Sequence, residues 1–183
     1  MKRLRYEPIE VVLPQENPGY GDRPRFRRSP HAAEPGAEYS GLRVRVALVR
    51  DPGYKPARAP QIHTAADVAN LVRKETGDSP VELFLVLLLT GQHRCSGVHE
   101  VHRGTLTNVE VHPADVLRVA LAAAAPAIIL VHNHPSGDPL PSAEDRALTR
   151  RMKEAAKLLG IVVLDHVIVT HDSFASFADT GIL

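Results

Sequence analysis

Two histidines and an aspartate with metal-ligand spacing stand in the segment over 131–145. His132 and His134 follow an apolar run over 127–131 that predicts a buried strand, and side chains two apart on a strand point to the same side. Asp145 comes eleven residues after His134, beyond a loop with three prolines and a glycine. Two neutral imidazoles and one carboxylate leave one tetrahedral position of Zn²⁺ open, as catalytic zinc requires. The segment therefore predicts a catalytic metal site.

Each part of this segment also has an ordinary structural interpretation. The sequence from Ser142 to Asp145 is typical of a helix start, in which Ser142 caps the helix and Asp145 accepts from free amides of the first turn. A pair of histidines at a strand end is often exposed or structural. The combination of an apolar strand, aligned imidazoles, a stiff loop and a helix-start carboxylate favours a metal site over these separate explanations.

A metal site of this kind is suited to hydrolysis. Zinc lowers the pKa of a bound water to about 7, which provides a nucleophile near neutral pH. A nearby carboxylate could take the water proton and return it to a leaving amine, a role worth roughly 10²–10⁴ in rate. Donors beside the metal stabilise the charge on the attacked oxygen. The predicted reaction is hydrolysis of an amide or isopeptide bond in a protein or peptide.

The same segment resembles the signature of the JAB metalloprotease family, also called JAMM or MPN+. That signature is His-x-His-Pro, a loop, and Pro-Ser-x-x-Asp, and this chain has His132-Asn133-His134-Pro135 followed by Pro141-Ser142-Ala143-Glu144-Asp145. The sequence resembles in particular the RadC-like bacterial branch, with similarity from about Arg43 to the C-terminus. The further matching segments are Val111-His112-Pro113, Leu164-Asp165-His166 and Ser176-Phe177 before Gly181.

The resemblance implies a role for each matching residue. His132, His134 and Asp145 match the family's zinc ligands, so Zn²⁺ is the implied cofactor. Ser142 matches the serine that donates to the developing oxyanion. The resemblance also implies a JAB/MPN-like mixed β-sheet flanked by helices.

A glutamate on an early strand is the general acid/base of the family. Glu82, directly before the apolar run over 83–89, stands at the matching place. By its own position Glu82 is better explained as a solvated residue at a strand start, so its assignment depends on the resemblance. Glu100 and Glu110 lie on other predicted strands and are the alternatives.

The hydropathy pattern after residue 41 predicts helices interleaved with mostly apolar strands, a layered α/β or α+β fold. Helices are expected from Thr64 to near Gly77, from Pro113 into the alanine-rich stretch 120–125, and from Ser142 to about Leu159. Strands are expected at 44–49, 83–89, around Val98 and Val101, at 105–111, at 127–131, at 161–170 and at 174–177.

The first 60 residues differ from the rest in charge and proline content. They contain 12 lysines and arginines against 7 aspartates and glutamates, a net +5, which leaves −4 for residues 61–183 because the total is +1. Nine of the 15 prolines also lie there. We expect a basic arm over 1–40, extended or partly disordered, before a RadC-like JAB domain over 41–183. The arm could contact nucleic acid, and its apolar segment 11–13 could dock on the domain or on a second protomer.

Cysteine content and hydropathy indicate a cellular location. The single Cys95 excludes an intramolecular disulfide framework. No apolar run approaches the roughly 20 residues of a membrane span, and the first residues do not resemble a signal peptide. A cytoplasmic location without a membrane partner is therefore expected.

Two other functional classes are alternatives to the peptidase. One is a DNA-associated RadC-like protein, a scaffold or nuclease whose basic arm binds nucleic acid. Many RadC-like proteins carry a helix-hairpin-helix module before the JAB domain, whereas this chain has the arm there, which weakens that hypothesis. The other is a non-catalytic interaction domain. Loops that would hold ubiquitin are not recognisable in this sequence.

Two further histidines also match positions of RadC-like chains. His112 and His166 are candidates for contacts that support the metal ligands from behind.

Overall fold

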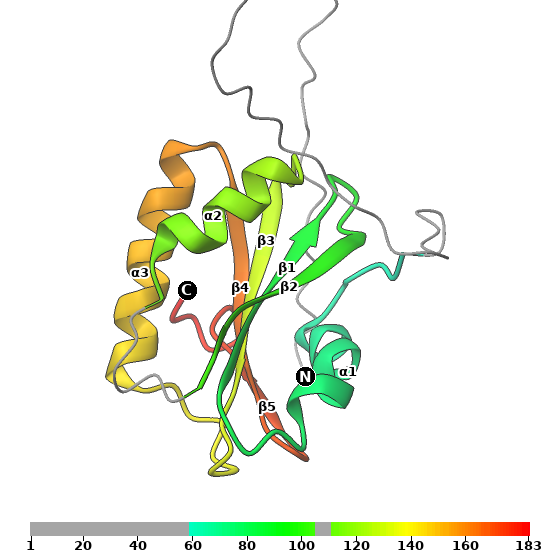
Figure 1. Cartoon of the computed structure of the whole chain (residues 1–183), viewed down its shortest axis with the longest axis vertical. Helices are drawn as coiled ribbons and strands as arrows, with labels where there is room; N and C mark the ends of the chain where they lie inside the picture. The colour runs from blue at the N-terminus through cyan, green and yellow to red at the C-terminus, as the bar shows by residue number, and fades with distance from the viewer. Residues whose placement is uncertain (1–58, 105–110) are drawn as a thin grey trace, which may run out of the picture. The chain divides into compact units, whose positions relative to one another are not determined.

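The computed structural model describes residues 59–104 and 111–183, which form a mixed β-sheet with helices on both faces (Figure 1). The helices are α1 (Ala65–Thr76), α2 (Pro113–Ala122) and α3 (Ala143–Leu158). The strands are β1 (Leu83–Leu89), β2 (Cys95–Arg103), β3 (Ala127–Asn133), β4 (Val162–Val169) and β5 (Phe174–Ser176). This α+β arrangement confirms the predicted fold class. None of the described helices is both long enough and apolar enough to cross a membrane.

Several sequence predictions concern residues outside the described ranges. They are the basic arm over 1–40, the strand at 44–49, Glu110, and all but the last residue of the extended piece at 105–111. The domain boundary near residue 41 and the contact between arm and nucleic acid therefore stay predictions.

The helices begin where the sequence places capping residues. The Thr64 side chain accepts from the Asp67 amide at the start of α1, and Ser142 and Asp145 form the same reciprocal capping box at the start of α3. α2 begins with Pro113, whose missing N–H costs nothing in a first turn. The predicted helix starts are confirmed because these signals are local.

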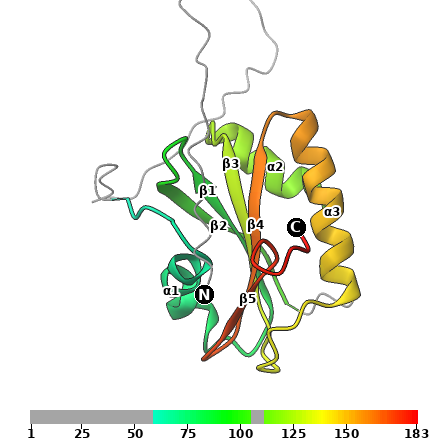
Figure 2. The same cartoon turned by 180° about the vertical axis from the view of Figure 1, so that it is seen from behind.

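The core has two layers, one on each face of the sheet. α1 covers one face, and α2 and α3 cover the other, as opposite views show (Figures 1 and 2). All seven residues of β1 and of β3 are buried, as in strands that are covered on both faces, and the predicted strand at 83–89 is confirmed. Alternate β1 residues therefore serve opposite layers, with Leu83, Leu85, Leu87 and Leu89 toward α1 and Phe84, Val86 and Leu88 toward the other helices.

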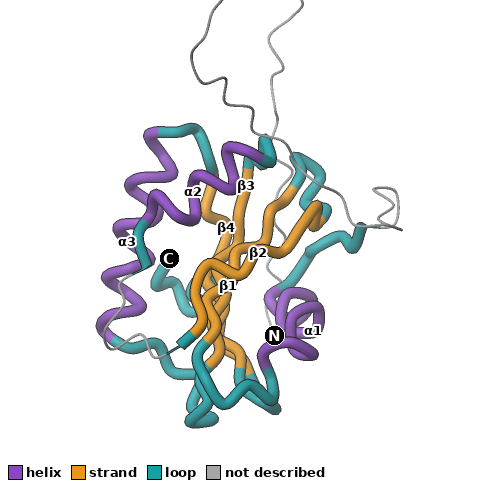
Figure 3. Tube along the Cα trace, in the orientation of Figure 1, coloured by secondary structure: helices purple, strands orange, loops and turns teal. Residues whose placement is uncertain are grey.

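The strand order explains how distant residues reach one place. The order across the sheet is β2-β1-β3-β4-β5, and β3 and β4 are parallel whereas the other pairs are antiparallel. A parallel pair needs a crossover, here α3, which must begin near the carboxyl end of β3 and return to the start of β4 (Figure 3). The first turn of α3 consequently lies beside the last residues of β3.

Candidate metal centre

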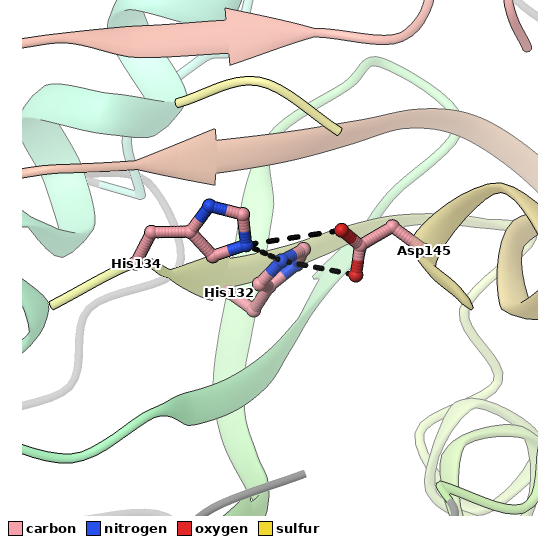
Figure 4. A group of neighbouring side chains, drawn as sticks. All are labelled: His132, His134 and Asp145. Carbon is pink, nitrogen blue, oxygen red and sulfur yellow. Dashed lines mark hydrogen bonds and ion pairs between the residues drawn. The ribbon is translucent and has the colours of Figure 1, made fainter. Parts of the chain in front are cut away.

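The two histidines lie together at the carboxyl end of β3 (Figure 4). The buried His132 pairs with Phe84 of β1 and with Ile168 of β4, while His134 follows the strand and is partly exposed. Their Nε2 atoms are 2.9 Å apart. The strand periodicity therefore brings both imidazoles to one point, as the sequence predicted.

Asp145 completes a cluster of three side chains. Its Oδ1 is 3.2 Å from His132 Nε2 and its Oδ2 is 3.8 Å from His134 Nε2. The ligand atoms of the cluster lie within 4.8 Å of one another. Ligands about 2.0–2.1 Å from one zinc ion at tetrahedral angles would be about 3.4 Å apart. The observed separations fall on both sides of that value, so these three side chains fit a single metal ion.

The helix-cap interpretation of Asp145 holds at the same time. Its Oδ2 accepts from the Ser142 amide at 2.8 Å and from the Ser142 hydroxyl at 2.6 Å, while Ser142 Oγ accepts from the Asp145 amide at 3.0 Å. These bonds fix the carboxylate with its other oxygen toward His132. The cap thus orients Asp145 for the cluster instead of competing with it.

The loop after β3 sets the tautomer of His134. The Nδ1 atom of His134 is 2.7 Å from the Asp138 carbonyl oxygen, which can only accept, so Nδ1 carries a proton and Nε2 is the bare nitrogen of the neutral imidazole. Gly137 adopts φ 84°, a left-handed conformation that favours glycine, and its amide donates to the His134 carbonyl at 3.1 Å. The tight loop therefore turns a metal-binding nitrogen toward Asp145.

Burial keeps His132 and His166 uncharged. Desolvation lowers the pKa of His132 to about 4; the Asp145 charge partly opposes this shift, and the neighbouring His134 adds to it. Burial also holds the pKa of His166 well below its ordinary value, with smaller contributions from His132 and His134. His132 and His166 are consequently neutral at pH 7. A histidine must be neutral to bind a metal.

His166 and Thr149 lie behind the cluster. His166 Nε2 is 2.9 Å from His132 Nδ1, and His166 Nδ1 is 2.7 Å from Thr149 Oγ1. The sequence named His166 as a candidate for such a contact, and the structure confirms the contact with His132. The contribution of Thr149 was not predicted; the available signal was its place four residues after Asp145, one helical turn along the same face. His112 occupies the N-cap position of α2 without a side-chain cap bond.

The C-terminal segment fixes the place of His166. Asp165 Oδ1 accepts from the His166 amide at 2.7 Å and from the Ala178 amide at 3.0 Å, and Asp165 Oδ2 accepts from the Ser176 hydroxyl at 2.6 Å. The Phe177 ring stacks on the His166 ring with centroids 4.8 Å apart. The matching segments at 164–166 and 176–177 thus act together as support for this imidazole.

Glu82 lies one residue before β1 and is half-buried. Phe84 pairs with His132 in the sheet, and the two rings stack with centroids 6.1 Å apart. The Gly104 amide donates to the Glu82 carbonyl at 2.9 Å, which continues the β1–β2 pairing by one residue, so strand alternation puts Glu82 on the sheet face of Phe84 and His132. The alternative Glu100 is exposed on β2, where Arg103 binds both its carboxylate oxygens at 2.7 and 2.9 Å.

Asn133, between the two histidines, holds the main chain on both sides of Glu82. Its Oδ1 accepts from the Leu83 amide at 2.7 Å, and its Nδ2 donates to the Val81 carbonyl at 3.2 Å. The Asn133 side chain is buried. The strand that carries the histidines is therefore tied directly to the segment that carries the glutamate.

Comparison with known proteins assigns the family. The model of a RadC-like JAB domain matches residues 62–182, about two thirds of the chain. This chain belongs to the RadC-like JAB domain family. The match contains the whole cluster, Glu82 and the residues behind the cluster, and it confirms the predicted resemblance from Ile62 onward.

Curated relatives of this RadC-like JAB domain carry the name UPF0758 protein. The relative from Trichlorobacter lovleyi is 45% identical over 118 residues, which are 64% of this chain and 51% of that protein. The relative from Geotalea uraniireducens is 50% identical over 109 residues, 60% of this chain and 48% of that protein. The chain thus spans about half the length of the curated relatives it matches. Their name states neither an activity nor a substrate.

Proposed function

We propose that this RadC-like JAB domain is a zinc-dependent peptidase or isopeptidase that hydrolyses an amide bond in a protein or peptide. The observation that carries the proposal is the convergence of His132, His134 and Asp145, whose ligand atoms lie within 4.8 Å of one another. Family membership supports it, because the matched range contains these three residues, and they are the ones at which the sequence resembles the JAB metalloprotease signature.

The chemistry of the donor set supports zinc. Two imidazole nitrogens and a carboxylate oxygen are the ligands of many catalytic zinc sites. Zinc, when bound, supplies Lewis-acid polarisation and a nucleophile at neutral pH. The protein's part is to hold the ligands ready: burial keeps His132 neutral, the Asp138 carbonyl orients His134, and Ser142 orients Asp145.

Glu82 is the proposed general base and acid. It takes a proton from the attacking water and returns it to the leaving amine, so that amide and water become carboxylic acid and amine with no net proton change. Its half-buried position on the sheet face of His132 supports the role. The two Asn133 bonds support it further, since they fix the main chain from which this carboxylate extends.

Ser142 is the proposed hydrogen-bond donor to the oxyanion. Its hydroxyl carries one proton, which it donates to Asp145 Oδ2 at 2.6 Å. The proposed contact therefore requires Ser142 to turn this proton from Asp145 to the carbonyl oxygen when substrate is bound. The Ser142 hydroxyl would then donate to the negative charge that develops on the carbonyl oxygen during the reaction.

The loop after β3, which follows His134 directly, is exposed. Pro135, Ser136, Gly137 and Asp138 are exposed, and 70% of the surface of Leu140 is accessible. His134 retains 16% exposure of its side chain beside this loop. An exposed loop that carries an apolar side chain offers a contact for a polypeptide, which we propose as the substrate class.

The proposed function predicts metal-dependent cleavage. The purified protein should contain about one zinc per chain and should cleave members of a mixed library of peptides and isopeptide-linked conjugates, with products identified by mass spectrometry. Removal of zinc by a chelator should abolish cleavage, and stoichiometric zinc should restore it. Cleavage that persists after zinc is removed to below one ion per hundred chains would contradict the proposal.

A further inference from the structure

Five short contacts connect the backbone of α3 to the loop after β3 through the cluster. In order they join the Asp145 carbonyl to Thr149 Oγ1 at 2.6 Å, Thr149 Oγ1 to His166 Nδ1 at 2.7 Å, His166 Nε2 to His132 Nδ1 at 2.9 Å, His132 Nε2 to His134 Nε2 at 2.9 Å, and His134 Nδ1 to the Asp138 carbonyl at 2.7 Å. Both ends of this series of contacts are carbonyl oxygens, which only accept hydrogen bonds.

The side chains in this series have one hydrogen too few. A threonine hydroxyl supplies one hydrogen, and each of the three imidazoles supplies one N–H in the neutral form that binds a metal, so four hydrogens are available for five contacts. One contact must then join two bare acceptor atoms. A cation placed between those atoms would remove their repulsion.

The two ends determine where the bare contact falls. If Thr149 donates to the Asp145 carbonyl, its oxygen accepts from His166 Nδ1–H, which leaves His166 Nε2 to accept from His132 Nδ1–H. At the other end His134 donates through Nδ1. The contact without a hydrogen is then the one between the two Nε2 atoms, at the position of the metal.

We propose that Thr149 and His166 are positioning residues that fix the tautomer of His132, so that its bare Nε2 faces the metal. The inference rests on the proposed function, because it concerns the metal of that site. Thr149 is 2% exposed and His166 is fully buried, so water cannot easily replace either partner. An unpaired buried N–H is costly.

Loss of the Thr149 hydroxyl affects the metal-bound and metal-free states differently. Without the hydroxyl, the metal-bound state leaves His166 Nδ1–H without its partner. In the metal-free state the hydrogen bonds between these imidazoles can run in the opposite direction. His166 Nε2–H then donates to His132 Nδ1, and His132 Nε2–H points toward His134. Loss of the hydroxyl therefore penalises the metal-bound state more than the metal-free state.

The test compares Thr149→Val, Thr149→Ser and a matched control, Thr76→Val. The buried Thr76 likewise donates to the carbonyl four residues earlier, that of Val72, at 3.0 Å, but in α1. Competition with a chromophoric chelator should show zinc affinity about 10–100-fold weaker in Thr149→Val, the range for partners that support metal ligands. Thr149→Ser should stay within about threefold of the wild type, and Thr76→Val should be unchanged.

Nitrogen-15 NMR of the zinc-loaded wild-type protein provides a second readout that does not depend on a variant's folding. The proposal requires the His166 proton on Nδ1. A proton on Nε2, or unchanged zinc affinity in a folded Thr149→Val, would overturn the role of these residues while leaving the proposed function intact. A wild-type protein that binds no zinc would overturn both.

Discussion

Replacement of Asp145 by asparagine is expected to weaken zinc binding by more than about 100-fold. Partners behind metal ligands typically contribute 10–100-fold to affinity, and loss of a charged ligand should cost more. Asparagine keeps the size of the side chain and an oxygen that can accept from Ser142, so the start of α3 should persist. The measurement is chelator competition on the wild-type and variant proteins, with thermal unfolding followed in parallel.

Asp67→Asn is the matched control for this prediction. Asp67 occupies the equivalent capping-box position at the start of α1, where its Oδ2 accepts from the Thr64 amide at 2.8 Å and from the Thr64 hydroxyl at 3.0 Å. It should lose the same helix-cap charge and keep wild-type zinc affinity. Equal affinities in Asp145→Asn and the wild type would exclude Asp145 as a ligand.

Glu82→Gln is expected to keep zinc and to lower the rate of hydrolysis by roughly 10²–10⁴, because the amide cannot take a proton from water. The main-chain bonds on either side of residue 82 come from Asn133 and do not depend on the glutamate side chain. We therefore expect unchanged zinc affinity together with lost turnover. The measurement is kcat on the best substrate from the library, beside chelator competition.

Glu100→Gln provides the comparison, since Glu100 was the alternative base on a described strand. This exposed carboxylate forms a paired contact with Arg103, which lowers the pKa of Glu100 through hydrogen bonding. Its loss should leave turnover within about twofold of the wild type, as for a surface ion pair of small energetic value. Full activity in Glu82→Gln, or a large loss in Glu100→Gln, would show that the base is assigned wrongly.

The fold was predictable wherever local signals decided it. Thr64 and Ser142 cap their helices through residues three positions away, and the seven-residue apolar run of β1 suffices to indicate a central strand. Strand order was not predictable from the residues alone, because the antiparallel β1–β3 pair and the parallel β3–β4 pair depend on contacts distant in sequence.

The candidate site likewise contains residues that local patterns predict and residues that they do not. His132, His134 and Asp145 were identifiable because strand alternation and a helix start predict their orientation locally. The contact between His166 and Thr149 joins β4 to α3 and depends on the phase of the helix against the sheet, which one sequence does not reveal. The bonds from Asn133 to Val81 and to Leu83 at the start of β1 are missed for the same reason, since they span 52 and 50 positions.

Anomalous diffraction from crystals of the zinc-loaded protein, measured on either side of the zinc absorption edge, tests the metal centre most directly. The expected result is one zinc ion about 2.0–2.1 Å from Nε2 of His132 and Nε2 of His134, with an Asp145 oxygen as third ligand and the fourth position open. Absence of zinc between these side chains in protein that carries the ion elsewhere would contradict the account.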